Sequence, residues 1–153
     1  MRNLNVPMYD PEMVRPMREE LTRLGFEEMR TPEEVDAVMT KERASTLVVV
    51  NSVCGCAARN ARPAAALAIQ NQKRPARLLT VFAGQDADAT ARARGYFTGY
   101  QPSSPQNALF KDGKIEFMLG RRNIEGRQAS DIAADLTQAF ERSSPNDAGP
   151  FGA

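Results

Sequence analysis

Histidine and tryptophan are absent from this 153-residue sequence, and cysteine occurs only twice. Without histidine, the chain has neither Ser-His-Asp nor Cys-His catalysis, and it lacks the usual nitrogen ligands of catalytic zinc. Long hydrophobic runs are missing too: no stretch approaches the ~20 apolar residues that span a membrane, and the first residues have no signal-peptide core. We therefore expect a cytoplasmic protein that has no membrane partner.

The sequence also lacks an excess of either charge, because 20 basic residues are balanced by 19 acidic ones and the net charge is +1. Nucleic acids are bound largely through an excess of basic side chains. The basic pairs Arg92/Arg94 and Arg121/Arg122 are not accompanied by an aromatic platform on which bases could stack. We expect no nucleic-acid partner.

Strand and helix patterns alternate along the chain. The predicted helices cover residues 10–24, 31–39, 57–73, 86–97 and 130–142, and the predicted strands cover 26–30, 46–50, 77–83, 108–110 and 115–118. This order predicts an α/β fold in which helices cover both faces of a mixed sheet. The length suits one domain, which we place at residues 1–142, and we expect residues 143–153, rich in Gly, Pro and Ser, to form a disordered tail.

Proline and glycine mark three places where the local structure is predictable in more detail. Pro16 falls inside the first helix, so that helix either kinks or begins after Asp10, and its apolar face is predicted to hold Met13, Met17, Leu21 and Leu24. Pro63 should bend the helix of residues 57–73. Asp112-Gly113 supplies the positive φ angles of a type I′ turn and so predicts a β-hairpin.

Both cysteines lie in one motif, Cys54-Gly55-Cys56, between the strand of residues 46–50 and the helix that follows. Backbone N–H groups at a helix start favour a thiolate, which is the reactive form of a thiol. Gly55 would let the linking residue turn within a tight, readily reduced disulfide. We expect Cys54 to attack a mixed disulfide and Cys56 to resolve it, although the reverse assignment stays open.

Other interpretations of these residues also remain open. The cysteines could be small buried hydrophobic residues, or half of a metal site completed by a second subunit. A cytoplasmic disulfide is more often catalytic than structural, which favours redox chemistry. Arg59 and Arg62 could stabilise a Cys54 thiolate or attract an anionic thiol, or they could be solvated charges on a helix.

A second motif lies downstream of the cysteines. Pro105, followed by Phe110-Lys111-Asp112-Gly113, resembles the thioredoxin pattern in which a cis-proline opens a strand. The resemblance implies that the Ser104–Pro105 bond is cis and faces the cysteines. It also implies that the backbone of Ser104 pairs with an extended substrate.

Nearly the whole chain is similar to the bacilliredoxins, a thioredoxin-like family with Cys-Gly-Cys in place of Cys-x-x-Cys. The similarity is carried by Tyr9-Asp10-Pro11, by residues 50–57 around the cysteines, by Ser103-Ser104-Pro105-Gln106 and by Ile124-Glu125-Gly126-Arg127. It implies removal of bacillithiol from protein mixed disulfides, or weak disulfide reduction or isomerisation, without a bound cofactor. Family members often carry histidine near Arg122, so local pKa tuning here is expected to differ.

The expected partners are oxidised or S-thiolated proteins and a low-molecular-weight thiol, bacillithiol in the first place. Cys54 and Cys56 are the predicted catalytic residues, and no metal is expected. The predicted substrate-binding positions are Asn51, Gly55, Ser104 and Pro105. Two alternative functions are a metal-bridged homodimeric binding module built on the cysteine pair, and a thioredoxin-like adaptor without turnover.

Overall fold

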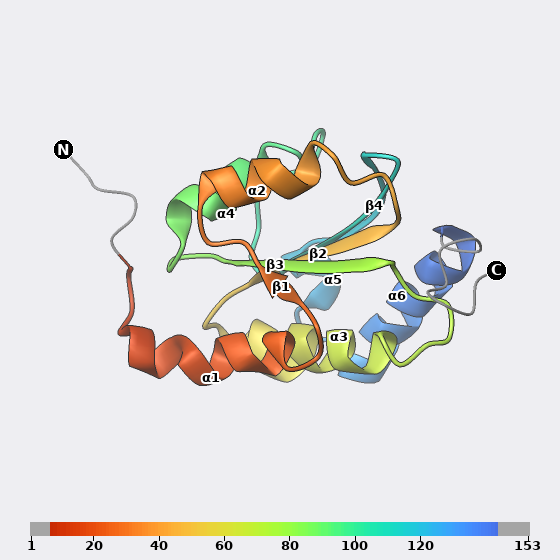
Figure 1. Cartoon of the computed structure of the whole chain (residues 1–153). Helices are drawn as coiled ribbons and strands as arrows, with labels where there is room; N and C mark the ends of the chain where they lie inside the picture. Colours follow the sequence, from red (N-terminus) through yellow and green to blue (C-terminus); the bar gives the residue numbers. More distant parts are fainter. Residues whose placement is uncertain (1–6, 144–153) are drawn as a thin grey trace.

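A five-stranded mixed sheet lies at the centre of the protein, with the strand order β1-β3-β2-β4-β5 (Figure 1). Its strands are β1 (Glu27–Glu28), β2 (Thr46–Asn51), β3 (Arg77–Phe82), β4 (Gln106–Lys111) and β5 (Lys114–Leu119). The first three strands run parallel, whereas β4 and β5 are antiparallel to their neighbours. This computed structural model describes residues 7–143, so the predicted tail lies outside the described residues except for Ser143, which ends the last helix.

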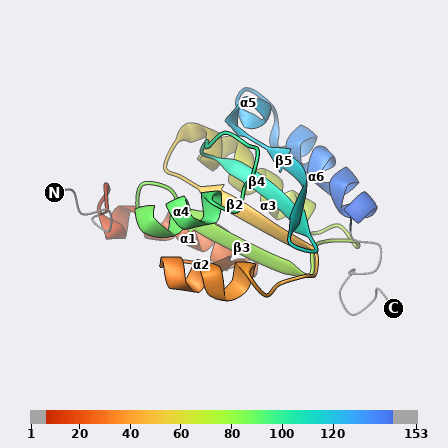
Figure 2. The same ribbon diagram turned by 90° about the horizontal axis from the view of Figure 1, so that it is seen from above.

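Helices cover both faces of the sheet, as predicted. They are α1 (Pro11–Thr22), α2 (Pro32–Met39), the π-helical turn η1 (Ala57–Ala61), α3 (Arg62–Ala68), α4 (Ala87–Arg94), α5 (Arg121–Ile124) and α6 (Ala129–Ser143). In Figures 1 and 2, α2 and α4 lie on one face, and α1, α3 and α6 lie on the other. The α/β, thioredoxin-like fold class is confirmed.

All six residues of strand β2 are buried, so the strand packs against helices on both faces of the sheet. Leu47 and Val49 pack into the core under α3 and α6, while Val48 and Val50 pack into the core under α2 and α4. A strand buried on both faces is a continuous run of β-branched and aliphatic residues. The same strand carries the chain directly to the cysteine motif.

The predicted hairpin between β4 and β5 is present. Asp112 has φ 54° and Gly113 has φ 77°, the paired positive angles that a type I′ turn requires. This turn places β5 on the edge of the sheet, next to β4. The end of β5 then leads into α5, which the sequence did not predict because four residues are too few to show a helical period.

The helix after the cysteines differs from the prediction of one helix over residues 57–73. The chain forms η1 first, in which the N–H of Arg62 donates to the carbonyl of Ala57, and α3 then ends at Ala68. Pro63 has no N–H to give to the Arg59 carbonyl, and π-helical turns are a common form of such a disruption. The predicted irregularity near Pro63 is therefore present as a widened turn.

The buried face of α1 differs from the predicted one in the first half of the helix. The helix starts at Pro11 with Asp10 as its N-cap and continues through Pro16, but Met13 is 47% exposed and Val14 is fully buried. The reason is Arg18, which occupies the inward position four residues after Val14. Arg18 interrupts the apolar pattern, so hydrophobic periodicity misplaced Met13, whereas Leu21 is buried in the core and Leu24 packs against it as predicted.

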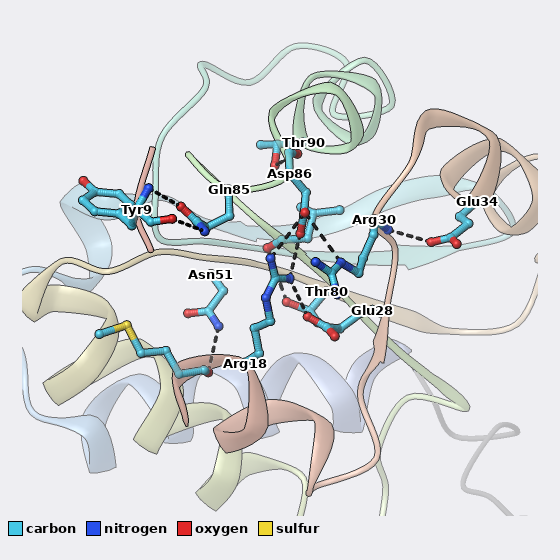
Figure 3. Close-up of polar contacts among 12 residues, drawn as sticks. Tyr9, Arg18, Glu28, Arg30, Glu34, Asn51, Thr80, Gln85, Asp86 and Thr90 are labelled. Atoms are coloured by element: carbon cyan, nitrogen blue, oxygen red, sulfur yellow. Dashed lines mark hydrogen bonds and ion pairs between the residues drawn. The ribbon is translucent and has the colours of Figure 1, made fainter. Parts of the chain in front are cut away.

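Arg18 joins α1 to two other elements (Figure 3). Its Nη1 donates to Glu28 Oε2 at 2.8 Å and to Asp86 Oδ2 at 2.7 Å, and its guanidinium lies over the ring of Phe82. The side chains of Arg18 and Asp86 are each 11% exposed. Arg18 thereby fixes α1 against β1, β3 and the start of α4.

We expect the substitution Arg18→Met to lower the free energy of unfolding by about 3 kcal/mol, because it removes the cation shared by Glu28 and Asp86 and, among the described residues, leaves Asp86 with only its 3.6 Å contact to Arg30. The matched control is Arg15→Met on the same helix, whose side chain is 59% exposed and whose loss should cost less than about 0.5 kcal/mol. Urea denaturation of both variants measures the difference, and equal effects would contradict this role of Arg18.

Candidate active site

The two cysteines lie where β2 gives way to the helical segment. Strand β2 ends at Asn51, and the Cys54 carbonyl accepts hydrogen bonds from the N–H groups of Ala57 and Ala58, both at 3.1 Å. Cys54 and Cys56 are both half-buried, and both thiols are free. The motif therefore has the position that the sequence predicted for it, at the start of a helix.

Cys54 has the surroundings of a reactive thiol. Its Sγ is 3.1 Å from the hydroxyl oxygen of Ser52. Burial opposes ionisation, but the Ser52 hydroxyl, the N–H groups of Ala57 and Cys56, and the charge of Arg121 outweigh it and lower the pKa of Cys54. Cys54 is thus favoured as a thiolate, the nucleophilic form.

Cys56 has the opposite surroundings. Its thiol donates to Glu125 Oε2 at 3.4 Å. Burial, this hydrogen bond and the nearby Cys54 raise the pKa of Cys56, although Arg121 opposes the shift. Glu125 is held in place by Arg121, whose Nε donates to the same carboxylate oxygen at 3.2 Å. The surroundings therefore shift the two pKa values in opposite directions, so that the thiolate is favoured more at Cys54 than at Cys56.

A buried arginine supports the loop beneath the cysteines. Arg62 is 3% exposed. Its Nη1 donates to Asn51 Oδ1 at 2.9 Å and to the Ser52 carbonyl at 2.8 Å, and its Nε donates to Glu20 at 2.9 Å. Arg62 is therefore neither a solvated charge nor a direct partner of the Cys54 sulfur. It fixes the backbone that presents Ser52 to Cys54.

The side chain of Asn51 is part of the hydrogen-bond network that supports this loop, and it faces the interior of the protein. It is 2% exposed, its Oδ1 also accepts from the Ser52 N–H at 2.8 Å, and its amide nitrogen donates to the Met17 carbonyl of α1 (Figure 3). Every polar atom of the side chain is satisfied from within the protein. The structure therefore places Asn51 beneath the loop as a support, and a direct contact between Asn51 and a substrate stays a prediction.

Gly55 is exposed but does not use the conformational freedom that we expected of it. It is not one of the glycines with positive φ. A Cβ added at this position would lie 2.8 Å from Nη2 of Arg59, the flexible end of an exposed side chain. In the dithiol form, therefore, Gly55 makes room for Arg59 beside the cysteines.

The Ser104–Pro105 peptide bond is cis, as the resemblance to thioredoxin implied. Pro105 is buried and Ser104 is half-buried. The Ser104 carbonyl lies 3.5 Å from Nη1 of Arg121, which also binds Glu125. Arg121 thus connects the proline loop with the carboxylate that contacts Cys56, and the two predicted motifs meet at one site.

Three contributors to the site did not emerge as functional residues from the sequence. Ser52 lies two residues before Cys54, so its closeness was the only available signal. Arg121 and Glu125 lie on or just after α5, and Glu125 is 69 positions from Cys56. Only the packing of α5 beside the helix start brings them to the thiols.

Neither metal binding nor membrane insertion is indicated in the described part of the chain. Across residues 7–143, no group of three or more His, Cys, Asp or Glu side chains could hold a metal ion. Over the same residues, every helix is too short or too polar to cross a bilayer.

The sheet topology, the dithiol at a helix start and the adjacent cis-proline are those of thioredoxin-like thiol–disulfide oxidoreductases. Comparison with known proteins agrees. A family model described as disulphide isomerase matches residues 9–144. A bacilliredoxin of Salinibacter ruber is 56% identical over 135 residues, covering 87% of this chain and 79% of its own length.

Two further bacilliredoxins match at 53% identity. The protein of Koribacter versatilis does so over 88% of this chain and 93% of its own length, and that of Bacillus cereus strain ZK / E33L over 90% and 95%. The chain therefore belongs to the bacilliredoxin family, and its role is that of a thiol–disulfide oxidoreductase.

The contact with Ser52 predicts the pH profile of Cys54. In a Cys56→Ser background, we expect alkylation of Cys54 by iodoacetamide to rise with pH around a midpoint below that of a free thiol. Adding Ser52→Ala should move this midpoint upward and slow alkylation at pH 7 roughly tenfold, as expected for the loss of about 1.5 kcal/mol from one hydrogen bond to a charged group. Ser52→Thr keeps the hydroxyl and serves as the control; an unchanged profile in Ser52→Ala would exclude this role.

The contact between Glu125 and Cys56 predicts the opposite effect on the pKa of Cys56. In a Cys54→Ser background, Glu125→Gln should lower the pKa of Cys56, since it removes the negative charge that favours the protonated thiol and replaces it with a neutral amide. Cys56 should then be alkylated at lower pH, as followed by intact mass. Glu116→Gln makes the same charge change at an exposed position of β5 and should leave the profile unmoved. The assignment fails if both substitutions shift it equally or neither does.

Proposed function

We propose that the protein removes a low-molecular-weight thiol, bacillithiol in the first place, from mixed disulfides on other proteins. Cys54 attacks as the thiolate, and Cys56 resolves the intermediate. The observation that carries the proposal is the opposite tuning of two neighbouring thiols: the pKa of Cys54 is lowered and that of Cys56 is raised. The bacilliredoxin relatives support the choice of substrate.

The reaction needs two exchange steps. In the first, the Cys54 thiolate attacks the bacillithiol sulfur, a Cys54–bacillithiol disulfide forms, and the substrate cysteine leaves as a thiolate. In the second, Cys56 loses its proton and attacks the Cys54 sulfur, which forms the Cys54–Cys56 disulfide and releases bacillithiol. A thiol reductant must then supply two electrons and two protons to restore the dithiol, so no bound cofactor is needed.

The surroundings of each thiol suit its step. A lowered pKa increases the thiolate fraction of Cys54, the form that attacks in the first step. In the second step the leaving group is bacillithiol, whose sulfur is displaced from Cys54. Keeping Cys56 protonated delays its attack until the mixed disulfide has formed. The carboxylate of Glu125 lies within reach of the Cys56 proton and is placed to accept it.

Disulfide isomerisation is a second candidate, favoured by the description of the matching family model. It would use the same Cys54 attack on a disulfide within a substrate protein. The intermediate would then be released by a second substrate cysteine before Cys56 could react. The half-exposed backbone beside the cis-proline is where an extended substrate segment would pair in either reaction.

Intact mass spectrometry tests the assignment of roles. The Cys56→Ser variant, mixed with a protein carrying one bacillithiol, should gain one bacillithiol on Cys54 and release the substrate thiol. The Cys54→Ser variant should gain none at pH 7, because its remaining thiol is protonated.

The other outcomes have definite meanings. An adduct only on Cys56 would reverse the two roles. No adduct in either variant would refute thiol transfer from this substrate. In that case, a metal assay on protein purified without chelator tests the metal-bridged dimer, and thiol titration before and after mild oxidation tests the adaptor.

A further inference from the structure

A pocket of about 530 Å³ opens beside the cysteines, between the loop of residues 100–103, the end of β5 and α5. Two residues belong both to its wall and to the surroundings of the thiols: Glu125, which accepts from the Cys56 thiol at 3.4 Å, and Arg121, which acts on both sulfurs. The volume falls in the range of about 300–1,000 Å³ typical of small-molecule sites. A small molecule joined to Cys54 therefore has this pocket immediately beside it.

The pocket wall carries an excess of positive charge. It includes two arginines and one carboxylate, and that carboxylate is already bound by Arg121. Arg122 is exposed, and it forms no hydrogen bond or ion pair with any residue among those described, 7–143. One cation on the wall is thus free to bind a carboxylate or another anion.

The remaining wall is uncharged and combines polar side chains with the apolar side chains of Pro102 and Met118, and part of it is held in shape by hydrogen bonds. Gln106, only 1% exposed, accepts from the Ser103 N–H at 3.4 Å and donates to the Gln101 carbonyl at 3.1 Å. Arg94 fixes the same loop by donating to the Ser103 carbonyl at 2.7 Å. The side chains of Tyr100 and Asn123 complete a wall suited to hydroxyl and amide groups. A preformed wall lowers the ordering cost of binding a small polar ligand.

We propose that this pocket binds the anionic, hydroxyl-rich part of the low-molecular-weight thiol while its sulfur is joined to Cys54, and that Arg122 is a specificity-determining residue that pairs with its carboxylate. The proposal rests on the proposed function, whose substrate it narrows. In this proposal, the pocket distinguishes one thiol from another by the part of the molecule that lies away from the sulfur. A neutral thiol without such a part would react at the cysteines without using the pocket.

The test compares three adducts of one carrier protein that has a single cysteine. The adducts are bacillithiol, coenzyme A, which is anionic through phosphates, and neutral 2-mercaptoethanol. Single-turnover rates of adduct removal are measured for the wild-type chain and for Arg122→Gln, Arg122→Lys and Arg142→Gln. Arg142 is exposed near the far end of α6 and controls for the loss of one positive charge.

We expect Arg122→Gln to slow removal of bacillithiol roughly fivefold, about the effect of one exposed charge pair, and to leave removal of 2-mercaptoethanol unchanged. Arg122→Lys should retain most of the wild-type rate, and Arg142→Gln should match the wild type. An effect confined to coenzyme A would overturn the pairing of Arg122 with a carboxylate and make this an anion-binding pocket for phosphate groups.

Three other results would overturn the proposal. If Arg122→Gln slows the removal of all three adducts equally, Arg122 has a structural role. If it slows the removal of none, Arg122 does not take part in recognising the thiol. If the wild-type chain removes bacillithiol no faster than 2-mercaptoethanol, the pocket does not select the thiol, although exchange at the cysteines stands. Failure of the wild-type chain to remove any adduct would instead refute the proposed function itself.

Discussion

The buried guanidinium of Arg62 is the interaction on which the geometry of the site depends. It gathers the Asn51 side chain, the Ser52 carbonyl and the Glu20 carboxylate around one cation. A buried charge is tolerated only where such partners surround it, and removing one partner is costly. The loop between β2 and Cys54 is therefore held in one conformation, and Ser52 is kept at the sulfur that it activates.

This constraint extends into the rest of the fold through α1. Glu20 and the Met17 carbonyl, both on α1, bind Arg62 and Asn51 respectively. Arg18 on the same helix is bound to Glu28 and Asp86 on the other side (Figure 3). Helix α1 thus connects the edge of the sheet with the active-site loop through hydrogen bonds and ion pairs, although it contributes no reacting group.

The difference between the two thiols has another origin, since it comes from groups on opposite sides of the motif. The helix start and Ser52 act on Cys54, whereas Glu125 reaches Cys56 from α5. Arg121 links this carboxylate to the cis-proline loop and lies on the wall of the neighbouring pocket. One short helix therefore contributes both to the control of protonation and to the surface that a thiol ligand would contact.

The sequence by itself determined the features that depend on neighbouring residues. The all-aliphatic run in β2 predicted a strand buried on both faces, the pair Asp112-Gly113 predicted its turn, and the spacing of Cys54 and Cys56 pointed to redox chemistry. The cis bond at Pro105 followed from the resemblance of a motif. These features were predictable because backbone preferences and short-range spacing act within a few residues.

The tertiary structure alone decided which distant side chains act on the thiols. Glu125 and Cys56 lie 69 positions apart, and α5 is too short to show a period. Arg59 and Arg62 lie close together in the same segment, yet Arg62 is buried and supports the loop, whereas Arg59 is exposed. Met13 was misassigned for the same reason, and the burial of Asn51 could not be foreseen either. Burial and charge pairing are set by how distant elements pack together, and local periodicity carries no information about that.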